Sequence, residues 1–409
     1  MRSQWWSPER LRALQRERLR SILQHAGENS PFYRERFAEA GITAADLRSP
    51  EVLQAIPPTG REDLQDSGRM ISRGYRRDRM RSSRTSGSTG TPTVTWFDPW
   101  SWFLGKHLLK LRARMACGLG PLDRVAIFQE EVGPGFRRAL AGRRASLSVH
   151  SDPSEALALL GSYRPTALYG PPGYLAHLAD AGPDLPSVRR IFTSAEMLAP
   201  STRNRLQEAF GAPVLDVYGC TELKEIAWQC EEQGGYHLNC EWIFVEVDPG
   251  EAPSGSGEGT ILVTSLYNRG MPLIRYRVGD TGRELEGICP CGRGLPLILP
   301  GMGRSVDYVH LPDGRAISPY ALTLAVEPVN GVRQYQIHQL ARDHVRVRFL
   351  GEYSPVTGGG EDPVGDAIRS ALGPILPGVR VEPERVDRLH REPSGKFRIV
   401  RSDVSPHRA

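Results

Sequence analysis

Hydrophobic and polar positions change their period several times along the chain, and these changes predict the secondary structure. Residues 8–40 have a helical period, and the stretch "SPFYRERFAEAG" ends on glycine, a typical helix stop. From about residue 100 to 300, helical segments alternate with short apolar strands, at "DRVAIFQ", "TALYG", "VRRIFTS", "PVLDVYG", "WIFVEV" and "GTILVTS". Such alternation favours an α/β fold built on a sheet.

The pattern changes again near residue 300. The stretch "LPGMGRSVDYVHLPDGRAIS" is rich in turn residues, and a short α+β pattern follows it. Strands are expected at "QYQIHQL", "HVRVRFLG" and "GVRVEPERV", and a helix at "GEDPVGDAIRSALGPIL". We therefore expect two domains, residues 1–303 and residues 304–409, with a hinge near residues 303–307.

Length and composition agree with this division. A chain of 409 residues is too long for one ordinary core, and 39% hydrophobic with 24% charged residues is typical of a soluble globular protein. We find no apolar run long enough for a membrane span and no signal-peptide pattern, so a cytoplasmic protein without a membrane partner is expected. The net charge of +5 is compatible with a small anionic substrate.

One stretch, "SSRTSGSTGTPTVTWFD" from Ser82 to Asp98, has Ser, Thr or Gly at most positions and is a candidate binding loop. A flexible linker has the same composition, but a linker has no reason to pass directly into the β-prone run "VTWF". Glycines let the backbone approach phosphate oxygens, and hydroxyls and amides supply neutral donors. A phosphate-binding loop and a mobile loop both fit. The Rossmann, Walker and G-x-S-x-G motifs are absent, so a phosphate loop here is of another kind.

Three further stretches narrow the choice. "VYGCTE" puts Tyr218 and Glu222 after the strand "PVLD", "RYRVGDTGR" puts Asp280 in a turn after a strand, and "REPSGKFR" puts Lys396 in a glycine turn near the C-terminus. Each is ordinary by itself. In this order and spacing, together with "TSGSTGTPT", they resemble the adenylate-forming superfamily of acyl-CoA synthetases, luciferases and adenylation domains. The N-terminal "SPFYRERFAEAG" and "IPPTGREDL" resemble its phenylacetate–CoA ligase branch, and the resemblance covers essentially the whole chain.

The resemblance implies a fold and a reaction. The expected fold is α/β, with a large N-terminal domain of mixed sheets and packed helices and a small mobile α+β C-terminal domain. A carboxylic acid, aryl or otherwise small, would attack the α-phosphorus of ATP, release pyrophosphate and form an acyl-adenylate, whose acyl group then passes to the thiol of CoA. The transition state is crowded with negative charge, so catalysis is mainly positioning and electrostatic stabilisation.

The resemblance also implies roles for residues. The phosphates of ATP would be held by Ser86, Gly87, Ser88, Thr89, Gly90 and Thr91. Adenine would lie against Tyr218 and be lined by Ser194, Ala195 and Glu196 of "TSAEM", with Gly219 and Thr221 nearby. Asp280 would bind the ribose hydroxyls, and Arg304 the ribose or a phosphate. Glu222 would hold Mg²⁺, and Lys396 would bridge the substrate carboxylate and the α-phosphate.

The chain departs from the family at the hinge and at the segment after it. Relatives usually read "GRxDD", whereas "GRSVDY" has Val306 at the pivot, and "LPDGRAISPYAL" differs from the glycine-rich loop of CoA ligases. The acceptor therefore stays open between CoA and another nucleophile, an amine or a carrier-protein thiol. The acid also stays open. Its pocket is expected at the carboxyl ends of strands, near Phe136, Tyr169, Gly170 and Tyr174, which core packing explains equally well.

Cysteine and histidine gather in two short clusters, "CEEQGGYHLNC" and "GICPCGR". Soft thiolates and imidazole suit tetrahedral Zn²⁺, although five unrelated buried residues are the alternative. Some members of the resembled branch carry a structural zinc in this pattern, which matches Cys230, His237, Cys289 and Cys291. We expect a zinc that links two loops and has no part in the reaction.

Two other classes of protein fit parts of the sequence. The arginine runs "RGYRRDRMRSSR" and "FRRALAGRR" and the "CPCG" pair together suggest nucleic-acid binding, but this leaves the adenylation motifs unexplained, so no nucleic acid is expected. A degenerate nucleotide binder is disfavoured because Lys396, Glu222 and Asp280 are all present. Monomer and homodimer both remain possible.

Overall fold

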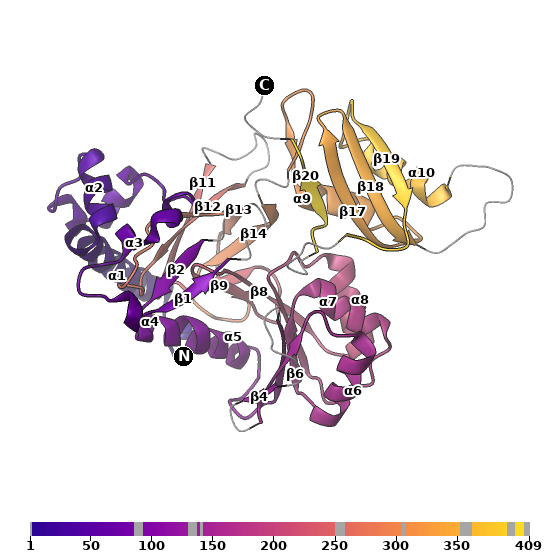
Figure 1. Cartoon of the computed structure of the whole chain (residues 1–409), viewed down its shortest axis with the longest axis horizontal. Coiled ribbons are helices and arrows are strands. Elements are labelled where there is room, and N and C mark those ends of the chain that lie inside the picture. The colour runs from indigo at the N-terminus through magenta and orange to yellow at the C-terminus, as the bar shows by residue number, and fades with distance from the viewer. Residues whose placement is uncertain are drawn as a thin grey trace.

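A computed structural model of the chain describes residues 2–85, 93–129, 137–139, 142–249, 258–304, 308–351, 362–390 and 397–404. A twelve-stranded sheet with its helices occupies most of the sequence, and a four-stranded sheet with two helices follows it and lies beside it in space (Figure 1).

The N-terminal segment is helical and covers one end of the large sheet (Figure 1). It contains η1 (Arg2–Trp5), α1 (Pro8–Asn29), α2 (Pro31–Glu39), η2 (Asp46–Arg48), η3 (Pro50–Ala55), η4 (Asp63–Asp66), α3 (Ser67–Met70) and η5 (Arg77–Arg79). Helix α1 begins where Ser7 caps it, because the serine hydroxyl accepts the amide of Arg10. The helical structure predicted over residues 8–40 is confirmed, as α1 and α2.

A hairpin and a long helix follow. Strands β1 (Arg81–Arg84) and β2 (Val94–Phe97) pair antiparallel. Asp98 then caps a continuous helical stretch made of α4 (Pro99–Phe103), the π-helical turn η6 (Leu104–Leu108) and α5 (Leu109–Ala116). π-helical turns inside helices are frequent at functional sites.

One half of the large sheet is parallel and is covered by helices. Its strands are β3 (Val125–Gln129), β5 (Arg144–Ser148), β6 (Ala167–Gly170), β7 (Arg190–Ser194) and β8 (Val214–Cys220), in the order β5-β3-β6-β7-β8. The short β4 (Arg137–Ala139) pairs antiparallel with β5. Helices α6 (Pro153–Tyr163), α7 (Pro172–Asp180) and α8 (Pro200–Phe210) connect these strands and share a hydrophobic core with them.

The other half of the large sheet is antiparallel and begins at β8. It continues through β9 (Lys224–Gln229), β10 (Tyr236–Leu238), β14 (Leu297–Arg304), β13 (Tyr276–Leu285), β12 (Gly259–Ser265) and β11 (Ile243–Asp248). A second core lies between this half and the N-terminal helices. The region "LPGMGR", expected to be part of a turn-rich segment, instead belongs to β14, because its backbone pairs with β13.

A buried ion pair joins the long helix to this half. Arg112 Nη1 on α5 lies 2.7 Å from Glu241 Oε2, and both side chains are almost fully buried. The pKa of Glu241 is lowered: burial opposes ionisation, but the guanidinium of Arg112, together with hydrogen bonds from Ser3 and the backbone, outweighs it. Arg18 on α1 donates to the backbone carbonyl of the same glutamate. Breaking such a buried pair leaves an uncompensated charge, so it holds three segments in one arrangement.

The C-terminal unit has a core of its own. It contains β15 (Val309–His310), β16 (Ala316–Ile317), α9 (Pro319–Val326), β17 (Val332–Ala341), β18 (His344–Gly351), α10 (Pro363–Leu372), β19 (Arg380–Arg385) and β20 (Val400–Ser402). Its main sheet has the order β19-β18-β17-β20. The α/β class predicted from the sequence is confirmed, and so are the strands named there. Among the described residues, no helix has the length and apolar character needed to cross a membrane.

Candidate active site

The sequence-predicted residues of "VYGCTE" lie at the carboxyl end of β8, where the sheet changes from parallel to antiparallel. Tyr218 was expected after the strand but lies inside it, because β8 continues to Cys220. Strand β9 turns back directly, and the register between the two strands shifts between Tyr218 and Gly219. This bulge interrupts the regular alternation of side chains between the two faces of the sheet at the end of β8.

Gly219 is needed for this turn. A Cβ at this position would lie 2.2 Å from the backbone carbonyl oxygen of Lys224, so any side chain would force the two strands apart. Lys224 itself has a positive φ of 65°. The tight backbone contact therefore fixes the path from Tyr218 to Glu222.

Two tyrosine hydroxyls each hold a predicted carboxylate. The Tyr218 hydroxyl donates to Asp280 Oδ2 over 2.8 Å, and the Tyr276 hydroxyl donates to Glu222 Oε1 over 3.0 Å. Burial, together with the neighbouring Glu222, raises the pKa of Tyr276, so this hydroxyl stays a neutral donor. Residues 218–222 are thus brought together with the strand that carries Asp280.

Asp280 was expected in a turn, and this prediction is wrong. It lies inside β13, opposite Arg304 of β14. The preceding Gly279 has a φ of +89°, and the register with β14 shifts between Asp280 and Gly282. A strand with a bulge and a left-handed glycine has the same sequence signature as a turn, which explains the error.

Lys224 was not predicted, and it links β8 to the β1–β2 hairpin. Its Nζ donates to Ser83 Oγ over 2.7 Å and to the carbonyl oxygen of Thr221 over 2.8 Å. The ammonium also lies 4.6 Å from the ring centroid of Phe97. Burial lowers the pKa of Lys224 to about 8. The sequence signal for this residue is only its place two positions after Glu222.

The hairpin brings together the two ends of the predicted phosphate loop. The amide of Thr85 donates to the carbonyl oxygen of Thr93 over 3.1 Å, and the amide of Thr93 donates to Thr85 Oγ1 over 3.0 Å. The predicted phosphate ligands Ser86–Thr91 lie outside the described residues, as do Phe136, Val306 and Lys396. The backbone of Arg304 pairs with Asp280.

The "TSAEM" segment lies at the end of β7, beside β8. Ser194 Oγ donates to the carbonyl oxygen of Val217 over 2.8 Å, and Ala195 has a φ of 76°, which is strained for a residue with a Cβ. The carboxylate of Glu196 accepts two amides, those of Gly173 on α7 and of Phe397, each over 2.9 Å. Glu196 therefore joins the large sheet to the segment that follows Lys396 in sequence.

The described residues that were expected to line the acyl pocket divide into two groups. Tyr169 and Gly170 end β6, and a Cβ on Gly170 would lie 2.9 Å from Phe128 Cβ, so the glycine permits close strand packing. Tyr174 is buried in the core under α7; its hydroxyl donates to the carbonyl oxygen of Ser151, and its ring lies 5.1 Å from that of Phe128. Tyr174 thus has a core role in this structure.

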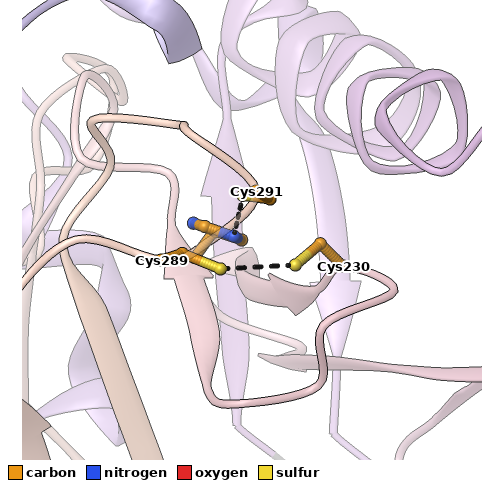
Figure 2. Close-up of side chains that lie close together, drawn as sticks. Cys230, Cys289 and Cys291 are labelled. Carbon is orange, nitrogen blue, oxygen red and sulfur yellow. Dashed lines mark hydrogen bonds between the residues drawn. The ribbon is translucent and has the colours of Figure 1, made fainter.

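A second group of polar residues is the cysteine and histidine cluster. The ligand atoms of Cys230, His237, Cys289 and Cys291 all lie within 4.8 Å of one another. Figure 2 shows the three cysteines converging from two loops. The Sγ atoms of Cys230 and Cys289 are 3.6 Å apart, and Cys291 Sγ lies 3.4 Å from His237 Nε2. Burial raises the pKa of Cys289 to about 12 and lowers that of His237 to about 4.

Comparison with known proteins finds similarity to AMP-binding enzymes and to acid–CoA ligases. The model of the AMP-binding enzyme family matches residues 139–263. Phenylacetate-coenzyme A ligase of Thermus thermophilus is 28% identical over 353 residues, which is 80% of this chain and 78% of that protein.

Solved structures agree at the level of the fold. The crystal structure of 2-hydroxyisobutyryl-CoA ligase in the postadenylation state, in complex with R3-HIB-AMP, matches the chain with a TM-score of 0.79 at 23% identity. In the thioesterification state with 2-HIB-AMP and CoA the TM-score is 0.64 at 25% identity. Each match covers 98% of this chain and 91% of the other.

The sequence resemblance to the adenylate-forming superfamily is therefore confirmed, and with it the expectation of an AMP-forming ligase. Within that superfamily, the confirmed likeness is to the phenylacetate–CoA ligases.

The glycine contact yields a prediction about stability. We expect Gly219→Ala to lower the free energy of unfolding by about 2 kcal/mol, since the new methyl group meets a backbone carbonyl that cannot rotate away. Gly234→Ala, whose Cβ would enter open space, is the matched control. Urea unfolding measures both. Equal stability of the two variants would show that the β8–β9 contact is not a tight constraint.

Proposed function

We propose that this protein activates a carboxylic acid with ATP to an acyl-adenylate and transfers the acyl group to the thiol of CoA. The observation that carries the proposal is the convergence of Tyr218, Glu222 and Asp280 at the end of β8, beside the hairpin that carries the "TSGSTGT" loop. The proteins it resembles are named as phenylacetate–CoA and 2-hydroxyisobutyryl-CoA ligases, and both names denote acid–CoA ligation.

In this proposal the nucleotide lies along the carboxyl ends of β7 and β8. Adenine stacks on Tyr218 near Ser194 and Ala195, with Gly219 and Thr221 beside it. Asp280 accepts the ribose hydroxyls, and its hydrogen bond from Tyr218 orients the carboxylate for that task. Arg304 contacts ribose or phosphate, and Ser86–Thr91 supply hydroxyls and amides to the phosphates.

Mg²⁺ is assigned to Glu222. A carboxylate oxygen is the ligand this cation prefers, and the hydrogen bond from Tyr276 fixes the orientation of the group. Bound there, Mg²⁺ would neutralise phosphate charge. Lys224, which links Thr221 to the hairpin, holds the metal-bearing turn and the flank of the phosphate loop at a fixed separation.

Lys396 is assigned to the reacting centre. During attack of the carboxylate on the α-phosphorus, negative charge accumulates on both groups, and an ammonium between them stabilises the transition state. Phe397, the next residue, donates its amide to Glu196 at the end of β7, which supports this assignment. Glu196 thereby supports the catalytic segment, a role different from the adenine contact that the sequence suggested.

The test of this function is a lysine substitution. We expect Lys396→Ala to slow ATP–pyrophosphate exchange by about 10²–10³, because one lost electrostatic contact to the transition state is worth about 3–4 kcal/mol. The control is Arg401→Ala, which removes an exposed cation that pairs with Asp403, two residues further along the chain. A folded Lys396→Ala protein with near-normal exchange would refute the assignment.

We also propose that residues 1–303 and 304–409 are two domains that move relative to each other about residues 303–307. The C-terminal unit has a separate core, and hydrogen bonds join it to the large sheet and its helices. Glu327 accepts the amide and hydroxyl of Ser201, at 3.2 and 2.8 Å. Since the TM-score is higher to the postadenylation state than to the thioesterification state, we assign this arrangement to adenylation.

This assignment predicts that one contact affects the two half-reactions unequally. We expect Glu327→Ala to slow pyrophosphate exchange about threefold to tenfold, the worth of one or two hydrogen bonds, and to leave acyl transfer from preformed adenylate unchanged. Glu384→Ala removes a carboxylate that pairs with Arg348 inside the C-terminal unit and serves as control. Equal slowing of both steps by Glu327→Ala would contradict the assignment.

We further propose that Cys230, His237, Cys289 and Cys291 hold a structural Zn²⁺. Two thiolates on a tetrahedral zinc lie about 3.8 Å apart, given Zn–S bonds of about 2.3 Å, and the Cys230–Cys289 distance of 3.6 Å fits this geometry. Four donors, three of them buried and Cys291 half-buried, complete a tetrahedral site and leave no open position for substrate. The metal would join the β9–β10 turn to the segment before β14 and so stabilise the antiparallel half of the sheet.

Metal analysis tests this site without any activity assay. Protein purified without added zinc should contain one zinc per chain, and Cys289→Ser/Cys291→Ser should lose it together with several kcal/mol of stability, since metal binding is coupled to folding. Cys117→Ser, which alters a buried cysteine outside the cluster, should keep the metal. Full zinc in the double variant would place the site elsewhere.

CoA is not the only candidate acceptor of the acyl group. The "LPDGRAISPYAL" segment departs from the CoA-channel loop of the family, so an amine or a carrier-protein thiol is the alternative acceptor. AMP release measured with CoA and with candidate amines separates the two.

A further inference from the structure

A group of basic side chains surrounds Tyr169 at the carboxyl end of β6. Lys110 and Arg114 on α5 are one helical turn apart, and both lie over the Tyr169 ring, with Lys110 Nζ at 5.0 Å and Arg114 Cζ at 5.4 Å from its centroid. Lys106 occupies the preceding turn and Arg144 begins β5. We call Lys106, Lys110, Arg114 and Arg144 the basic cluster.

Members of the basic cluster repel one another. The pKa of Arg144 is lowered first by burial and then by Arg114, and the pKa of Lys106 is lowered first by burial and then by Arg144 and Lys110. Like charges four residues apart on a helix are destabilising. The cluster therefore has an electrostatic cost.

Carboxylates do not neutralise the cluster within the part of the chain that the structure describes. No carboxylate there lies within ion-pair distance of its four members, and Arg114 Nε is buried without a hydrogen-bond partner. Lys110 and Arg114 lower the pKa of Glu225, but this acid is fully buried, and burial raises its pKa by more. Lys224 and His107 add further basic groups near Lys106 and Lys110.

The place of the cluster suggests what it binds. Tyr169 ends β6, which pairs with β7, and β7 ends at the Ser194–Glu196 segment next to Tyr218. A carboxylic acid whose carboxyl group faces the nucleotide at β7 and β8 would extend toward β6. Its far end would then meet Lys110, Arg114 and Arg144, with its carbon skeleton against the Tyr169 ring.

We propose that the acid activated here carries a second anionic group, a carboxylate or a comparable anion, which binds the basic cluster. This inference rests on the proposed function, because it concerns the far end of the same acid. Charge-assisted hydrogen bonds from Arg114 and Arg144 select the dianion, and a neutral acid of the same shape leaves these cations unpaired.

The test uses pairs of non-hydrolysable acyl-sulfamoyl adenosines that differ only at the far end of the acyl group. Succinyl is paired with butyryl, and 4-carboxybenzoyl with 4-methylbenzoyl, and binding is measured by calorimetry. In the native protein, at least one carboxylate-bearing analogue should bind about tenfold to hundredfold more tightly than its partner, as expected for a hydrogen bond to a charged group. Arg144→Gln should reduce that ratio to about threefold or less.

Arg143→Gln is the matched control, because Arg143 is the exposed neighbour of Arg144 and should leave the ratio unchanged. Lys110→Met provides a second variant if Arg144→Gln unfolds. A ratio at or below one for every pair overturns the inference. An equal loss of affinity for both members of a pair also overturns it, since the cluster would then serve nucleotide phosphate or CoA. Failure of all analogues and of ATP to bind would refute the proposed function itself.

Discussion

The backbone contact between Gly219 and Lys224 is the constraint on which the rest of the site depends. It lies where β8 ends, at the boundary between the parallel and antiparallel halves of the large sheet. Ligands of open α/β sheets bind beyond the carboxyl ends of strands where the topology changes. Because the turn is tight, Tyr218, Glu222 and Lys224 leave it at fixed positions and meet β13 and the β1–β2 hairpin.

Tyrosine hydroxyls hold the carboxylates of this region. Tyr218 binds Asp280, and Tyr276 binds Glu222. A phenol satisfies a carboxylate without neutralising it, so the negative charge stays available for a metal ion or for ribose hydroxyls. The cations in turn approach from other segments: Lys224 from β9 and, in the proposed function, Lys396 from the C-terminal unit. Carboxylates and cations on different segments suit a reaction in which the protein binds a phosphate group together with its metal ion.

The sequence predicted the α/β class and most strands, because these depend on local period. The resemblance to the family supplied the cluster of Cys230, His237, Cys289 and Cys291. The sequence did not predict that Asp280 lies within a strand, since a bulge with a left-handed glycine resembles a turn. The role of Glu196 depends on Phe397, 201 residues away. The basic cluster likewise joins one helix to strands β5 and β6. Contacts of that separation carry no signal in a single sequence.

The central claim is that the acid's own oxygen attacks the α-phosphorus of ATP, and isotope transfer tests it most directly. An acid that supports pyrophosphate exchange would be prepared with ¹⁸O in its carboxylate and incubated with the protein, ATP, Mg²⁺ and CoA. Mass spectrometry of the products follows the label. An acyl-adenylate intermediate predicts one ¹⁸O atom in AMP and none in pyrophosphate. Unlabelled AMP, or ADP with labelled phosphate, would contradict the account.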